Sequence, residues 1–191
     1  MRIVFLIILS ASVLLSCTSI EEKQEKHTYQ ILSLLVDEFG RPIKPPPPEG
    51  QKPYFTNKQI DSIMNRKQTI GVHHLLKHRK ENLSITKNID DESYLELLKV
   101  FSEYNEDLNL DITKLKSNKG YTVIFLDSLK SKQEQYITYD KQLYFSRIAF
   151  DDSFKKALTA ISIKHSGYFL CLLEKEKEKW KIRNSKMIYI Y

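Results

Sequence analysis

The chain has 191 residues and a formal net charge of +6 at pH 7, from 30 Lys and Arg against 24 Asp and Glu. Hydrophobic residues make up 41% and charged residues 28%, which is ordinary for one folded domain with a real core. Basic and acidic residues alternate along most of the sequence, so the small positive excess does not indicate a nucleic-acid-binding surface. We therefore expect a solvated, lysine-rich surface and no nucleic-acid partner.

The chain begins with a short apolar segment that ends at a cysteine. Arg2 is followed by "IVFLIILSASVLL" at residues 3–15, an arrangement and a length expected for a secretory signal. A membrane-spanning helix needs about 20 apolar residues, more than this run alone supplies. If the apolar stretch is counted through to Ile20, an uncleaved signal anchor is the alternative.

The end of this segment, Leu14, Leu15, Ser16 and Cys17, resembles the lipobox of bacterial lipoproteins. That pattern has an aliphatic residue three places before the cysteine and a small residue directly before it. The resemblance implies cleavage after Ser16, a thioether link between Cys17 and diacylglycerol, and acylation of the new amino terminus. Several acyl chains hold a protein stably at a bilayer, at about 0.8 kcal/mol per buried methylene.

This resemblance divides the chain into three parts. Residues 1–16 are the predicted signal peptide, residues 17–27 the lipidated cysteine and a polar tether, and residues 28–191 a single domain. The second mature residue is Thr18, whereas an aspartate there retains lipoproteins at the inner membrane in some Gram-negative families. We therefore expect a lipid-anchored protein of the cell envelope, at the outer membrane rather than the inner one. Its face, periplasmic or external, is left open.

The domain is predicted to be α+β, with helices over residues 28–119 and then an antiparallel β-meander of about five or six strands over residues 120–191. Its first helix, at residues 29–39, has an apolar face formed by Leu32, Leu35, Val36 and Phe39. All six prolines of the chain lie in residues 41–53. Four of them are consecutive, which favours a stiff polyproline II strap across the domain surface.

Further helices are expected before residue 120. Thr56 and Gln59 have the spacing of a capping box at the start of one of them. Its predicted buried stripe is Ile60, Ile63 and Met64. Another helix is expected over residues 72–81, and a further one begins at Asp90 or Asp91. The predicted buried residues of this last helix are Tyr94, Leu97, Leu98 and Phe101.

After Gly120 the sequence changes to short runs rich in β-branched and aromatic residues, which are typical of strands. The expected strands lie at residues 121–128, 135–140, 143–151, 156–165, 168–175 and 179–191. Turn-forming residues separate several of them, at 151–153 and 166–167. The charged run "EKEKEKW" at residues 174–180 is predicted to be the tip of the last hairpin.

Residues 145–182 resemble a recurring C-terminal segment of uncharacterised bacterial envelope lipoproteins. The shared features are a Ser-Arg pair, an Asp-rich turn, and a closing hairpin with Leu-Glu-Lys on one strand and Trp-Lys-Ile on the other. Related segments often carry glycine and cysteine between the two central strands, where this chain has His165, Ser166 and Gly167. The resemblance implies no known activity.

The strongest candidate metal site is "HHLLKH" at residues 73–78. On a helix, His74 and His78 would share a face, at a spacing that zinc-binding histidines use. The motif lacks the Glu of zinc proteases, no third ligand is identifiable, and the neighbouring lysines and arginine would repel a cation. A basic solvated helix face is therefore favoured, and we expect no cofactor other than the covalent lipid on Cys17.

Other polar residues favour structural roles. Asp151 and Asp152 are adjacent in a predicted turn, where both would be solvated and Arg147 could pair with one of them. Cys171 lies among apolar residues and is predicted to be a small buried side chain. If Cys17 carries lipid, Cys171 has no intramolecular disulfide partner, because the chain has two cysteines.

The last strand is the candidate interaction surface. It ends in "KMIYIY" at residues 186–191, where Met187, Tyr189 and Tyr191 alternate with two isoleucines. Tyrosine-rich strand ends bind partners and edge strands accept a partner strand. Apolar alternation is more typical of a core strand, so burial is favoured over recognition.

We therefore predict a non-enzymatic binding or structural module held at a membrane surface, with an unknown molecular function. The expected partners are the membrane, through the lipid anchor, and an envelope or secreted protein. Two alternatives stay open. One is an immunity-type lipoprotein that neutralises an exported toxin, and the other is a small metal-dependent hydrolase that uses His74 and His78.

Overall fold

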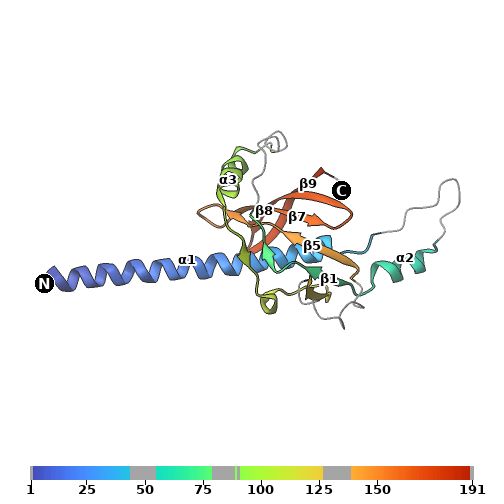
Figure 1. The fold of residues 1–191 in the computed structure, drawn as a ribbon, viewed down its shortest axis with the longest axis horizontal. Helices are drawn as coiled ribbons and strands as arrows, with labels where there is room; N and C mark the ends of the chain where they lie inside the picture. Colours follow the sequence, from blue (N-terminus) through green and yellow to red (C-terminus); the bar gives the residue numbers. More distant parts are fainter. Residues whose placement is uncertain (1, 44–54, 79–88, 90, 127–138, 190–191) are drawn as a thin grey trace.

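The computed structural model describes residues 2–43, 55–78, 89, 91–126 and 139–189 (Figure 1). The helices are α1 (Arg2–Phe39), α2 (Asn57–Met64), α3 (Glu92–Glu103) and a short 3₁₀ helix, η2 (Ile112–Lys114). The first strands are β1 (Thr69–Val72), β2 (Leu75–Leu76), β3 (Leu108–Asn109), β4 (Thr122–Phe125) and β5 (Lys141–Phe145). They are followed by β6 (Ala149–Phe150), β7 (Lys156–Ile163), β8 (Gly167–Glu176) and β9 (Lys179–Tyr189).

The main sheet has the order β4-β1-β5-β7-β8-β9, and β6 pairs with β7. β1 lies parallel to both β4 and β5, whereas β5, β7, β8 and β9 are antiparallel neighbours. β2 and β3 form a separate antiparallel pair. The hairpin between β8 and β9 turns at Lys177 and Glu178, whose φ angles of 45° and 65° fit a tight type I′ turn. Among the described residues, β9 is the last strand at one edge of this mixed sheet.

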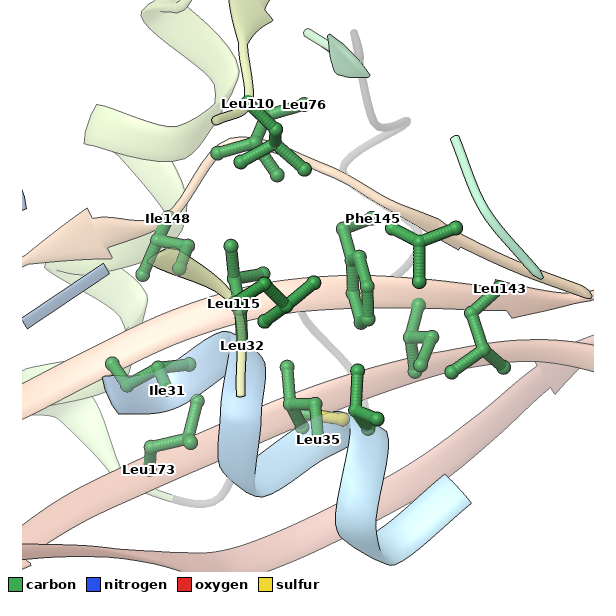
Figure 2. Packing of buried hydrophobic residues seen from close by; sticks show 14 of the residues in the cluster. Ile31, Leu32, Leu35, Leu76, Leu110, Leu115, Leu143, Phe145, Ile148 and Leu173 are labelled. Carbon is green, nitrogen blue, oxygen red and sulfur yellow. The ribbon is translucent and has the colours of Figure 1, made fainter. Parts of the chain in front are cut away.

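α1 packs against one face of this sheet (Figure 2). The helix residues at its centre are Ile31, Leu32, Leu35 and Val36, each 0% exposed. The sheet supplies Ile70, Val72, Leu143, Phe145, Ala157, Ile161, Cys171 and Leu173. Within β7 and β8 these are alternate residues, as expected because side chains along a strand point to opposite faces in turn.

α3 packs against the opposite face. Its buried residues are Tyr94, Leu97, Leu98 and Phe101, and they contact Leu158, Ala160, Tyr168, Leu170 and Leu172 of β7 and β8. The Tyr94 hydroxyl donates a hydrogen bond to the Leu173 carbonyl oxygen at 3.0 Å. Burial raises the pKa of Tyr94 to about 12. The sheet is thus the middle layer between two helices.

The segment from Asp111 to Lys119 holds α1 along one side. The helix residues that contact it are Glu25, Tyr29, Ser33 and Asp37, which are four positions apart and so lie on one side of the helix. The Glu25 carboxylate accepts a hydrogen bond from Lys114 Nζ at 2.7 Å. The Tyr29 hydroxyl accepts one from the Asp111 backbone N–H, also at 2.7 Å.

Asp37 makes the largest number of these contacts, and the residue is only 7% exposed. Its carboxylate accepts hydrogen bonds from the Ser117 hydroxyl at 2.5 Å and from the backbone and side-chain N–H groups of Asn118, each at 3.0 Å. The Lys119 backbone N–H donates a further bond at 3.3 Å. Asp37 therefore fixes the loop that leads into β4.

Much of the α+β prediction is confirmed. α3 begins after Asp91, whose carboxylate accepts a hydrogen bond from the Ser93 N–H at 3.0 Å, and it buries the four residues expected. α2 has the predicted capping box of Thr56 and Gln59. Strands occupy the described parts of most of the runs expected after residue 120, and the tip of the last hairpin lies within the charged run.

Four predictions about the fold are wrong. The sheet is mixed, not an antiparallel meander, and the helices do not all precede the strands, because β1 and β2 come before α3. Instead of a helix over residues 72–81, the described residues form the end of β1, then β2 and an isolated bridge at Lys77. β1 is a short run between two parallel partners, and such buried parallel strands lack an alternating pattern.

The fourth error concerns α2, in which no residue is buried, so that Ile60, Ile63 and Met64 are only partly covered. Residues 18–27, expected to be a polar tether, continue α1 as a helix, and His27 is only 4% exposed.

Several predictions fall outside the described residues: 44–53 of the proline-rich strap, 79–81, Asp90, the 135–138 part of a strand, Ile190 and Tyr191.

Candidate binding groove

A groove of about 650 Å³ lies along α1, between the η2 segment and the β8–β9 turn. Tyr29, Leu34 and Trp180 are its aromatic and aliphatic lining, and charged side chains surround them. A second groove, of about 470 Å³, shares Leu34 and Trp180 with the first and extends along α1 to Phe39. We call the two together the α1–β9 groove.

Trp180 and His27 join β9 to α1 beside this groove. Trp180 is 7% exposed, and its Nε1–H donates a hydrogen bond to His27 Nδ1 at 3.2 Å. An indole N–H donates only, so Nδ1 is the acceptor and the neutral imidazole carries its proton on Nε2. Gln30 Oε1 lies 3.0 Å from the same nitrogen and would accept a hydrogen bond from it if Nδ1 were protonated. The Trp180 contact therefore favours an uncharged His27, and the Gln30 contact opposes this preference.

Phe150 and Phe154 complete an aromatic cluster around His27. Their ring centroids lie 6.4 and 5.3 Å from that of His27, and Trp180 meets the same ring edge-on at 5.7 Å. Phe154 has a φ of 54°, in the left-handed region that a side chain with Cβ disfavours. Lys23 Nζ lies 4.8 Å from the Phe154 ring centroid. The cluster thus holds the β6–β7 turn against α1.

Burial lowers the pKa of His27 below its ordinary value of 6.5, and the nearby cations of Lys175, Lys23 and Lys26 lower it further, against an opposing contribution from Gln30. At pH values between the folded-state and unfolded-state pKa of His27, the unfolded chain therefore binds a proton at this residue that the folded protein does not. We expect the free energy of unfolding to fall as the pH drops below about 6.5, until the folded-state pKa is passed. Urea denaturation at a series of pH values measures this change.

Two variants test whether His27 causes this pH dependence of stability: His27→Phe, and His165→Asn as its control. The first removes the titrating ring and should flatten the fall in stability between pH 7.5 and pH 5 relative to the parent chain. The second changes an exposed histidine in the β7–β8 turn, which has a φ of 60° that Asn tolerates, and should leave the fall unchanged. An unaltered pH slope in His27→Phe would contradict the assignment.

Ion pairs neutralise most of the acidic side chains around the groove. Glu25 pairs with Lys114 at 2.7 Å, and Glu178 pairs with Lys175 at 2.6 Å. The Lys175 contact also lowers the pKa of Glu178. At the far end of the groove, Glu38 pairs with Arg41. These carboxylates are therefore already balanced by cations of the same chain.

Three lysines at the groove differ in this respect. Within the part of the chain that the structure describes, Lys26, Lys116 and Lys179 take part in no ion pair, although all three line the groove. Glu22 is the acidic side chain of the lining that likewise has no ion pair there. After internal pairing, the groove keeps an excess of positive charge.

His74 and His78, the predicted metal candidates, do not lie on one helix. His74 follows β1, and its ring stacks on His73 with centroids 4.7 Å apart. His78 Nδ1 lies 2.8 Å from one oxygen of Asp107, and Lys77 Nζ lies 2.8 Å from the other. Hydrogen bonds from Lys77 and His78 lower the pKa of Asp107. Among the described residues, no three or more His, Cys, Asp or Glu side chains are grouped to hold a metal ion.

Arg147 and Asp151 have separate structural roles, and no pairing between them is present in the described structure. The Arg147 guanidinium lies over the Tyr104 ring at 4.3 Å and donates a hydrogen bond to the Glu106 carbonyl oxygen at 3.0 Å. Asp151 accepts hydrogen bonds at 2.7 and 2.8 Å from the backbone N–H groups of Lys155 and Lys156. Asp152 is exposed, as expected for a turn residue.

Cys171 is 0% exposed on the α1 face of the sheet, as predicted, and burial raises its pKa to about 12.

The candidate interaction strand is divided between two environments. Met187 is 45% exposed, whereas Ile188 packs half-buried on the α3 side. The predicted burial of this strand is therefore only partial at the residues described.

The chain matches no protein-family model, no curated protein and no solved structure. None of the helices in the described residues combines the length and the hydropathy needed to cross a bilayer. The α1–β9 groove is thus interpreted from its own geometry and charge.

Sequence patterns did not identify His27 and Trp180 as partners, because they are 153 positions apart. A local signal was nevertheless present. His27, Ile31 and Leu35 are four positions apart, which places them on one helical face. Extending the apolar face of the first helix back by one turn would have put His27 inside the domain.

Proposed function

We propose that the protein is a membrane-anchored lipoprotein of the cell envelope, and that its domain is a non-enzymatic binding module with the α1–β9 groove as its binding site. The observation that carries the proposal is that one helix, α1, contains both the lipobox-like Cys17 and one wall of the groove. An anchor on this helix would keep the binding site at the membrane.

The spacing along α1 supports this arrangement. Among the side chains that the structure describes, Lys23 lies over Phe154 and Glu25 pairs with Lys114. An α-helix rises about 1.5 Å per residue, so Lys23 lies about 9 Å from Cys17 along the axis. The lipid would therefore hold the domain close to the bilayer instead of on a long tether.

The composition of the groove supports binding. Its lining combines aromatic and aliphatic side chains with a charged rim, the usual make-up of surfaces that recognise other molecules. Trp180 and Tyr29 line the groove with large aromatic rings, and aromatic residues are enriched at binding surfaces.

Metabolic labelling with a palmitate analogue tests the anchor. The parent chain should incorporate label and sediment with membranes, whereas Cys17→Ala should do neither. Cys171→Ala is the matched control, because that cysteine is buried in the sheet and should leave labelling intact. Label retained in Cys17→Ala, or no label in the parent chain, would overturn the proposal.

A further inference from the structure

We infer that the α1–β9 groove binds an extended, acidic segment of a partner protein, which pairs with the free edge of β9. This inference deepens the proposed function and rests on its assignment of the groove as the binding site. The inference does not depend on the lipid anchor. Palmitate labelling tests the anchor and peptide titration tests the groove, so either can fail without the other.

The first argument is the position of the groove at the edge of the sheet. β9 pairs with β8 on one side, and its other side has no strand partner among the described residues. The groove is lined by four successive residues of β9, from Lys179 to Ile182. Successive strand residues point to opposite faces, so a space that reaches all four reaches the backbone edge. Edge strands of this kind accept an extended peptide.

The second argument is length. The two halves of the groove follow α1 from Glu22 to Phe39, a distance of about 25 Å along a helix axis. An extended chain covers about 3.3 Å per residue, so about seven or eight residues would span it. This length suits a peptide segment better than a single small molecule.

The third argument is charge. Glu25, Glu38 and Glu178 are each paired with a cation of the same chain. Lys26, Lys116 and Lys179 are without an ion pair among the described residues. A segment with acidic side chains would complement these lysines, and an apolar side chain between them would contact Leu34 and Trp180.

Trp180 is the one tryptophan of the chain and lines both halves of the groove, so its fluorescence reports directly on occupancy. We would titrate the full chain, in a neutral detergent and without a bilayer, with a peptide of alternating Glu and Val, about eight residues long. Binding should shift the emission of Trp180 saturably. The affinity should fall as salt is added, because the contact is electrostatic.

Charge reversal provides the matched variants. The double variant Lys26→Glu, Lys179→Glu should weaken binding at least about tenfold at low salt. Lys164→Glu reverses an exposed lysine that follows β7, away from the groove, and should change the affinity by less than about twofold. Circular dichroism and urea unfolding of each variant show that a loss of binding is not a loss of fold.

Three outcomes would overturn the inference. One is equal binding of a peptide of alternating Lys and Val, which would exclude charge recognition. Another is unchanged binding by the folded double variant. The last is the same Trp180 shift when phosphatidylglycerol vesicles are added without peptide, which would assign the groove to anionic lipid.

Discussion

Replacement of Phe101 by alanine is expected to lower the free energy of unfolding by about 3–5 kcal/mol. Phe101 is 1% exposed and lies between α3 and the sheet face formed by Leu158 and Leu170. The substitution removes a large apolar side chain from water-free packing and leaves a cavity that the neighbouring strands cannot fully close. Urea or thermal unfolding followed by circular dichroism measures the loss.

Val100 is the control for this experiment because it is the preceding residue of α3 and is 39% exposed. Val100→Ala should change stability by less than about 0.5 kcal/mol, as exposed substitutions usually do. Comparable losses for Val100→Ala and Phe101→Ala would show that α3 does not pack on the sheet by the described face.

Replacement of Asp37 by alanine is expected to cost about 2–4 kcal/mol. The carboxylate accepts hydrogen bonds from Ser117, Asn118 and Lys119, and its loss leaves several half-buried donors without an acceptor. The loop before β4 should loosen first. Chemical denaturation measures the global loss, and hydrogen exchange at the backbone amides of Asn118 and Lys119 measures the local one.

Asp61→Ala is the matched control for Asp37→Ala. Asp61 is an exposed aspartate on α2, and alanine is a better helix former, so stability should change by less than about 0.5 kcal/mol. If Asp37→Ala were as stable as Asp61→Ala, the carboxylate would not be what holds the loop on α1.

The part of the fold that could be predicted is the part encoded locally. α3 was predicted with its four buried residues and a start at Asp90 or Asp91, because an aspartate precedes a run with apolar residues at helical spacing. The β7, β8 and β9 strands were found because they are long and are joined by short turns. In each case, residues close together in the sequence were enough to predict the element.

β1 shows why other elements were missed. Its four residues pair with β4 and β5, which lie about 50 and 70 positions later in the chain, and no local pattern encodes such parallel pairing. The histidines after it then favoured a basic helix. Tertiary contacts decide this segment, since His78 and Lys77 both bind Asp107, about 30 positions away.

The groove was missed for a related reason. Its walls come from α1, the η2 segment and the start of β9, so it exists only once the fold has formed. The sequence suggested the end of the last strand as a binding surface, whereas the groove lies at its beginning. The charged residues at the hairpin tip were interpreted as keeping this exposed end soluble. In the structure, ion pairs at the tip balance the acidic side chains, whereas some lysines have no ion pair among the described residues.

The unbroken course of α1 has a rotational consequence for the anchored protein that we propose. Successive residues of an α-helix turn by about 100° around its axis, so the number of residues between Cys17 and Lys23 sets the direction in which the domain faces. One inserted residue would swing the groove by about a quarter of a turn around α1, and about four would restore its direction. On such a helix, the number of residues between the anchor and the domain sets their relative orientation as well as the distance between them.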